Sequence, residues 1–272
     1  MKNYHVTRRA SSTSVWCGTV TGETVTRKSS NTTKRSNKTR RLPAFSDDGI
    51  LKREHFTPAF IDRLERHVAT LPNYSLITHE ERELSRRTFL DSFPNKKAFW
   101  VFGYGSLMWN PAIHVAESSR ARLFGYHRAF CLHLVIGRGG PKNPGLMLGL
   151  DSGGSCIGIA HRIAPKHVES ETEILWLREM IGSGYVPRQV SLNIDGRRVV
   201  GLTFVANRTS KRFAGCVPFT KAVRRIAKAE GDIGTNRDYL YRTIAHLNEF
   251  GLREGPLHEL ERAVRERTGD KD

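Results

Sequence analysis

The spacing of apolar residues changes near residue 98, where a helical pattern gives way to a strand pattern. Upstream of that point, 57–69 and 79–90 carry apolar residues at helical spacing. Thr57 stands just before a proline, and Thr78 stands three residues before a glutamate; both arrangements are typical of helix starts. We therefore predict an N-terminal extension of two helices over 46–97.

From residue 98 onward the chain alternates between short apolar runs and helical stripes. The predicted strands are 98–102, 120–136, 146–150, 156–163, 189–194 and 197–205. The last two strands flank Asp195-Gly196, which is a two-residue hairpin signal. The predicted helices are 167–181, 217–229, 236–249 and 256–268. Because strands and helices do not alternate regularly, we predict an α+β fold over 98–272, with a mostly antiparallel sheet or small barrel.

Charge separates the first 45 residues from the rest of the chain. Residues 1–45 hold ten Lys/Arg and one acid, which is more than half of the formal net charge of +17. This segment is rich in Ser and Thr and has almost no apolar periodicity, so we predict a basic disordered tail over 1–45. An Arg- and Ser-rich transit peptide and a nucleic-acid-binding arm are the alternatives. No aromatic residues are interleaved with the basic ones as stacking would require, so we do not expect a nucleic-acid partner.

Composition excludes several classes of protein. No stretch approaches the roughly 20 apolar residues of a membrane span, and no apolar segment of a secretory signal follows the start. The four cysteines form no CxxC pair, which argues against a zinc ribbon or a disulfide scaffold. Cys131, Cys156 and Cys216 lie in apolar runs and are predicted core residues. The histidines match no metal template, so we expect no metal site. With no secretory signal and no cysteine framework, we expect a cytoplasmic protein.

Two features carry candidate chemistry. Gly103-Tyr104-Gly105-Ser106 follows a buried strand, and two glycines there would let backbone N–H groups approach an anionic ligand. Neither a dinucleotide-binding fingerprint nor a P-loop fits, so a simple tight turn is the alternative. Glu179 extends a partly apolar helical stripe, and a carboxylate in an apolar pocket has the raised pKa of a general base. A surface glutamate paired with an arginine is the alternative there.

Four separated motifs together resemble the ChaC proteins, closest to their bacterial branch. They are Trp100–Pro111 (WVFGYGSLMWNP), Gly125–Cys131 (GYHRAFC), Arg178-Glu179-Met180 with Gly184-Tyr185, and Gly234-Thr235-Asn236 with Tyr239-Leu240. They occur in the right order over residues 98 to about 250. ChaC proteins are glutathione-specific γ-glutamylcyclotransferases, and the resemblance implies a small mixed β-barrel surrounded by helices.

The resemblance also implies a reaction and a site. Glutathione would cyclise to 5-oxoproline and release Cys-Gly, with Glu179 as general base and then acid, and with no cofactor. The implied substrate-binding residues are Val101, Phe102, Gly103, Tyr104, Gly105, Ser106 and Leu107. Some eukaryotic relatives have a second acid nine positions before the catalytic one, where this chain has Ser170. Arg128 or Arg138 is a candidate for the glycyl carboxylate.

Two other functions stay open at this stage. One is a broader γ-glutamyl-dipeptide cyclotransferase that uses the same base. The other is a non-catalytic basic protein that binds nucleic acid or regulates another protein.

Overall fold

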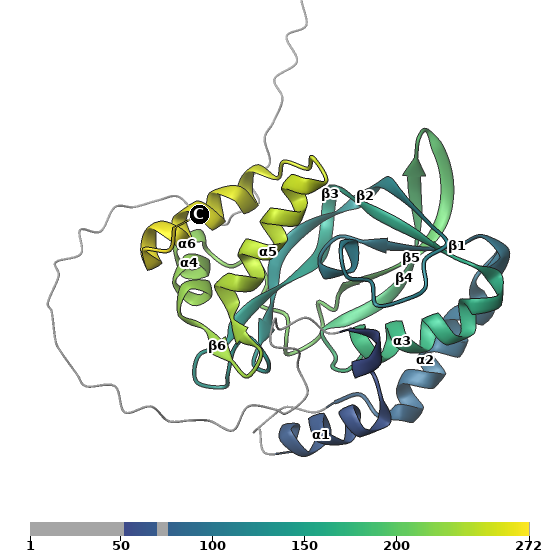
Figure 1. Cartoon of the computed structure of the whole chain (residues 1–272), viewed down its shortest axis with the longest axis horizontal. Helices are drawn as coiled ribbons and strands as arrows, with labels where there is room; N and C mark the ends of the chain where they lie inside the picture. Colours follow the sequence, from purple (N-terminus) through teal and green to yellow (C-terminus); the bar gives the residue numbers. More distant parts are fainter. Residues whose placement is uncertain (1–51, 70–75, 272) are drawn as a thin grey trace, which may run out of the picture.

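Five strands close into a barrel in the order β1-β3-β2-β4-β5 (Figure 1). The computed structural model describes residues 52–69 and 76–271. The strands are β1 Phe99–Gly103, β2 Glu117–Leu134, β3 Gly145–Ile163, β4 Tyr185–Ile194 and β5 Arg197–Ala206. All neighbours pair antiparallel except β1 and β5, which are parallel and close the barrel. The predicted α+β fold with a small mixed barrel is confirmed.

Helices pack around the barrel in two groups (Figure 1). The helices are α1 Pro58–Val68, α2 His79–Ser92, α3 Val168–Glu179, α4 Phe219–Lys228, α5 Asn236–Glu249 and α6 Gly255–Thr268. The last three pack against one another, and α2 packs against α3. Between α4 and α5 lies a small two-stranded sheet of β6 Glu230–Gly231 and β7 Gly234–Thr235, which the sequence pattern did not predict.

The strands β2 and β3 form one long hairpin that supplies much of the barrel wall. The sequence predicted two separate strands, 146–150 and 156–163, but β3 runs unbroken through the polar residues between them. Those residues stay paired with β2, as in Ser152 with Tyr126 and Ser155 with Phe124. A strand exposed at its bend needs no apolar alternation there, so the pattern failed at that point.

The N-terminal extension packs on α3. Thr57 and Thr78 cap α1 and α2 as predicted, each through a side-chain oxygen that accepts a backbone N–H. Arg86 of α2 is buried and donates to Glu169 and to Thr172 of α3. The extension therefore supports the helix that ends at Glu179. The predicted tail over 1–45 lies outside the described residues, and the other domain boundaries stay predictions.

Two further expectations need correction. The predicted helix 167–181 is shorter than expected, because it ends at Glu179 with Met180 as its C-cap. Cys131 and Cys156 are buried, but Cys216 is exposed, since it lies in the loop before α4 and not in a packed strand. Across 52–69 and 76–271, no helix combines the length and apolar character that crossing a membrane requires.

Candidate active site

The loop after β1 is held close against the following turn. A Cβ added to Gly103 would lie 2.8 Å from the carbonyl carbon of Leu107 and 2.9 Å from the Met108 nitrogen, so the backbone approach needs glycine. Gly105 has a φ of −130°, and a Cβ there would meet the Tyr239 hydroxyl at 3.6 Å. Gly105 thus has a negative φ, and its lack of a side chain leaves space beside the Tyr239 hydroxyl.

Two backbone donors in this loop have no acceptor among the described residues. The carbonyl of Gly105 accepts from Met108 at 2.8 Å, which starts a short 3-10 helix over Ser106–Met108. Among the described residues, the N–H groups of Gly105 and Ser106 find no acceptor. Two unused N–H groups at a close turn form a site suited to a carboxylate or another anion.

Three other predicted substrate-binding residues, Val101, Phe102 and Leu107, have buried side chains. Val101 and Phe102 are fully buried in the core, and their backbones pair with β3. The carbonyl of Phe102 also accepts from the Thr203 hydroxyl at 3.0 Å. Leu107 is buried as well, and its carbonyl bonds to the ring of the buried His161. A direct contact of these three side chains with substrate stays a prediction.

Glu179 lies at the C-terminal end of α3, and its side chain is only 14% exposed. Burial raises the pKa of Glu179, while the charge and hydrogen bond of Arg178 act in the opposite direction without cancelling it. The Arg178 Nε lies 2.9 Å from the Glu179 carboxylate. A carboxylate with a raised pKa in a closed site can both accept and return a proton near neutral pH.

Arg178 joins this carboxylate to the glycine loop. Its Nη2 donates to the Ser106 hydroxyl at 2.8 Å, and its Nη1 donates to the carbonyl of Asn110. The Arg178 side chain is only 8% exposed, and its guanidinium connects α3 to the loop through these hydrogen bonds. The two predicted features, the loop and Glu179, are thus brought together.

Three tyrosines lie within the electrostatic influence of Glu179, and all three lie in motifs quoted from the sequence. Burial is the largest cause of the raised pKa of Tyr104, Tyr185 and Tyr239, and the nearby charge of Glu179 raises each further. The Tyr104 hydroxyl donates to the carbonyl of Phe204 at 2.9 Å, and that of Tyr185 donates to the carbonyl of Leu148 at 2.6 Å. With raised pKa values, these three hydroxyl groups stay neutral near neutral pH.

Sequence reasoning gave no role to Tyr185, Tyr239 or Arg178. The available signal was their position within the quoted motifs, because nothing in local periodicity points a strand or helix residue toward a site formed by distant segments.

The loop 135–144 runs beside this site on a fixed support. The carbonyl of Gly137 accepts from Ile233 at 2.8 Å, which ties the loop to the turn between β6 and β7. The buried Asn236 amide bonds to both the N–H and the carbonyl of Leu146, each at 2.8 Å. The Gly234-Thr235-Asn236 motif therefore supports the start of β3, and Thr235 caps α5 with Asp238.

Of the two candidate arginines, only Arg138 remains a candidate for the glycyl carboxylate. Arg128 is buried and fully engaged by Glu254 and by the carbonyls of Tyr104 and Ile157, so it is unsuitable for a substrate carboxylate. Arg138 is largely buried, and its charge lowers the pKa of Tyr239. The charge of Arg178 also lowers that pKa, and the charge of Glu179 raises it. It also donates to the Thr235 carbonyl at 3.2 Å.

The acids near Ser170 are engaged away from Glu179. Glu171 is fully buried and accepts from Arg53 and from the N–H of His114, while Glu169 pairs with Arg86. Both serve to fix α3 to its neighbours. Within the described ranges, no group of three or more His, Cys, Asp or Glu side chains is placed to hold a metal ion.

Comparison with known proteins identifies the family of this chain. The family model "ChaC-like protein" matches residues 99–267. The glutathione-specific γ-glutamylcyclotransferase of Escherichia coli is 38% identical over 182 residues, which are 66% of this chain and 79% of that protein. The human glutathione-specific γ-glutamylcyclotransferase 1 is 29% identical, with 54% of this chain and 68% of the human protein covered.

Among solved structures, the selenomethionine-labelled yeast γ-glutamyl cyclotransferase specific to glutathione has a TM-score of 0.58 and 21% identity. In the selenomethionine form, the match covers 62% of this chain and 96% of the yeast chain. At this identity, the likeness supports the fold alone. The family model spans most of the chain and includes both Glu179 and the glycine loop. The chain belongs to the ChaC-like protein family.

Proposed function

We propose that this chain is a glutathione-specific γ-glutamylcyclotransferase. The observation that carries the proposal is a nearly buried carboxylate, Glu179, whose pKa is raised and which Arg178 links to a loop with two unused backbone N–H groups. The names of the Escherichia coli and human relatives support glutathione as the substrate. We place the activity in the cytoplasm, where thiols are kept reduced.

The reaction is an intramolecular aminolysis. The α-amine of the glutamyl residue attacks its own γ-carbonyl carbon, a new C–N bond closes the five-membered ring, and the amide bond to cysteine breaks. Glu179 takes the proton that the attacking amine loses and returns it to the leaving amine of Cys-Gly. The products are 5-oxoproline and Cys-Gly, and no atom is taken from another reactant.

Most of the rate gain comes from holding the substrate in the conformation that reacts. Nucleophile and electrophile belong to one molecule, so a site that holds the folded-back conformer removes much of the entropic barrier. The N–H groups of Gly105 and Ser106 would hold the glutamyl carboxylate, and the ring of Tyr239 would limit the space opposite. Arg138 would face the glycyl carboxylate from the loop 135–144.

A broader γ-glutamyl-dipeptide cyclotransferase would use the same base. The range of substrates that the chain accepts distinguishes that activity from the glutathione-specific one. The test is to incubate the full chain with glutathione, γ-Glu-Cys and γ-Glu-Ala and to quantify 5-oxoproline and the released amine. We expect equimolar 5-oxoproline and Cys-Gly from glutathione and a much lower kcat/KM for γ-Glu-Ala. Equal values for all three would assign the broader activity. No 5-oxoproline from any of them would overturn the proposal.

A further inference from the structure

A second pocket opens in the barrel wall where β2 and β4 part. The two strands pair only at Arg122 with Asn193 and at Leu123 with Leu192. Immediately after this, Gly125 adopts a φ of +84°, which L side chains rarely take, and the register of β2 shifts between Phe124 and Tyr126. This bulge turns β2 away from β4, as bulges do near binding sites.

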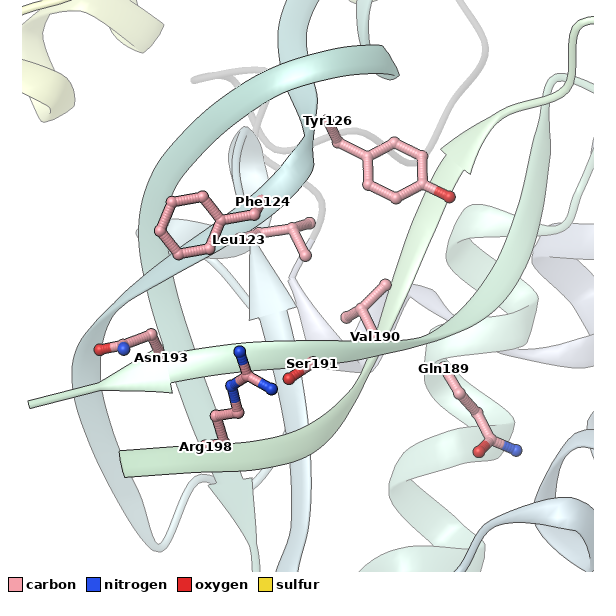
Figure 2. A pocket seen from close by; sticks show the side chains of 8 residues that line it. All are labelled: Leu123, Phe124, Tyr126, Gln189, Val190, Ser191, Asn193 and Arg198. Carbon is pink, nitrogen blue, oxygen red and sulfur yellow. The ribbon is translucent and has the colours of Figure 1, made fainter. Parts of the chain in front are cut away.

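The opening forms a cavity of about 400 Å³ (Figure 2). That volume lies within the range of roughly 300–1,000 Å³ seen for small-molecule sites. The cavity is lined by Leu123, Phe124, Tyr126, Gln189, Val190, Ser191, Asn193 and Arg198. None of these residues belongs to the site around Glu179, so the cavity is a separate feature.

The two sides of the cavity differ in chemistry. On the β2 side stand two aromatic rings, and Phe124 is 62% exposed although it is a large apolar residue. On the β4 and β5 side stand amide and hydroxyl groups and the guanidinium of Arg198, which Figure 2 shows reaching across β4 beside Ser191. A flat ring would stack on one side, and an anionic group would pair with the other.

The charge on the lining of the cavity is positive and comes from Arg198. The strand register aligns Arg122, Asn193 and Arg198 in one row across β2, β4 and β5. Arg122 lies 5.9 Å from the centre of the Phe124 ring, so a cation flanks the exposed aromatic. No acidic residue lines the cavity. The guanidinium of an arginine presents paired N–H donors whose geometry suits a phosphate.

We propose that this cavity binds a mononucleotide, with its base against Phe124 and Tyr126 and its phosphate on Arg198. The proposal is independent of the cyclotransferase activity, because the two sites share no residue. An aromatic face together with arginines is the combination that holds bases and phosphates in nucleotide-binding grooves.

The test measures binding of fluorescent N-methylanthraniloyl-ADP to the full chain, with a labelled single-stranded oligonucleotide as the second probe. Arg198→Ala and Phe124→Ala are the test variants. Arg197→Ala is the matched control for charge, since Arg197 is exposed on the same strand but does not line the cavity. Leu84→Ala is the matched control for an exposed apolar residue, because Leu84 is 68% exposed on α2.

We expect saturable binding of the mononucleotide that excess glutathione does not displace. Arg198→Ala should weaken it by about ten- to a hundredfold, the value of a hydrogen bond to a charged group. Phe124→Ala should weaken it about fivefold or more through lost stacking. Both control variants should bind like wild type. Absence of mononucleotide binding, equal loss in Arg197→Ala and Arg198→Ala, or pocket-dependent binding of the oligonucleotide alone would overturn the proposal.

Discussion

The guanidinium of Arg178 lies 2.9 Å from the carboxylate of Glu179, its neighbour in sequence, and also holds the Ser106 hydroxyl at 2.8 Å. One side chain thus sets both the position of the proposed base and its proton affinity. Burial raises the pKa of Glu179, and Arg178 lowers it, so the two effects oppose each other. The working pH range of the proposed site depends on this balance.

We predict that Arg178→Met moves the acidic limb of the kcat/KM profile to higher pH. A general base works only when deprotonated, so activity rises as pH passes upward through its pKa. Without Arg178 the pKa of Glu179 rises further, and the limb follows it. The measurement is 5-oxoproline formation across pH, with Arg178→Lys as the control that keeps the charge. An unmoved limb, or one moved to lower pH, would contradict the balance described.

The two loop glycines should respond differently to alanine. In Gly103→Ala the new methyl group meets the backbone of Leu107 and Met108 below 3 Å, so the free energy of unfolding should fall by about 1–3 kcal/mol. In Gly105→Ala the methyl group meets the Tyr239 hydroxyl at 3.6 Å, which is an ordinary contact. That variant should keep its stability.

We expect Gly105→Ala, which keeps its stability, to lose catalytic activity. Gly105→Ala narrows the space between the loop and Tyr239, so kcat/KM should fall by about tenfold or more, as expected for a displaced substrate. Chemical denaturation and glutathione kinetics on both variants check the pair. Normal kinetics in a folded Gly105→Ala would count against the loop as a binding element.

Local patterns were enough to place most elements. The caps at Thr57 and Thr78 and the hairpin at Asp195-Gly196 were found because each signal lies within a few residues. The continuous β3 and the short β6–β7 sheet were missed because pairing with a distant strand, not local alternation, holds them. Cys216 was wrongly predicted to be a core residue, because the apolar residues around it do not show that this segment is an exposed loop.

Much less of the candidate site follows from local pattern. The loop and Glu179 were weak candidates from residue chemistry and gained weight only from their order along the chain. The roles of Tyr239 and Arg178 depend on α5, α3 and the glycine loop meeting, which no spacing within one segment encodes. Arg128 looked suitable for a substrate carboxylate until its buried partners were known.

We predict that Arg86→Met destabilises the fold in a pH-dependent way. The hydrogen bond from Arg86 is the largest cause that lowers the pKa of Glu83 from 4.5 to about 2. A lowered carboxyl pKa contributes stability above its unfolded value, and this is lost as pH falls through the folded value. Wild type should therefore exceed the variant by about 1.5–3 kcal/mol at neutral pH, with the gap closing between pH 4.5 and about 2.

The matched control for this pair is Arg87→Met. Arg87 contacts the same Glu83 at 2.6 Å, but its side chain is 71% exposed, so its loss should change stability by about 0.5 kcal/mol or less. Urea denaturation over the pH range gives both values. An equal loss in the two variants would show that burial of Arg86 between α2 and α3 contributes nothing.

We predict that Arg138→Ala affects glutathione more than γ-Glu-Cys. The lost contact is to the glycyl carboxylate, which γ-Glu-Cys lacks at that position. One charge-assisted hydrogen bond corresponds to a loss of about ten- to a hundredfold in kcat/KM for glutathione. Lys142→Ala is the control, since Lys142 is exposed on the same loop. Equal losses for both substrates would place Arg138 at the glutamyl end or in a structural role.

The most direct test of the proposed mechanism is the rate of 5-oxoproline release from glutathione by Glu179→Gln. The substitution keeps the size of the side chain and removes the base, so the rate should fall by about 10²- to 10⁴-fold while the fold is retained. Glu173→Gln, at an exposed position on the same helix, should behave like wild type. A folded Glu179→Gln that forms 5-oxoproline at the wild-type rate would contradict the assignment of Glu179 as the base.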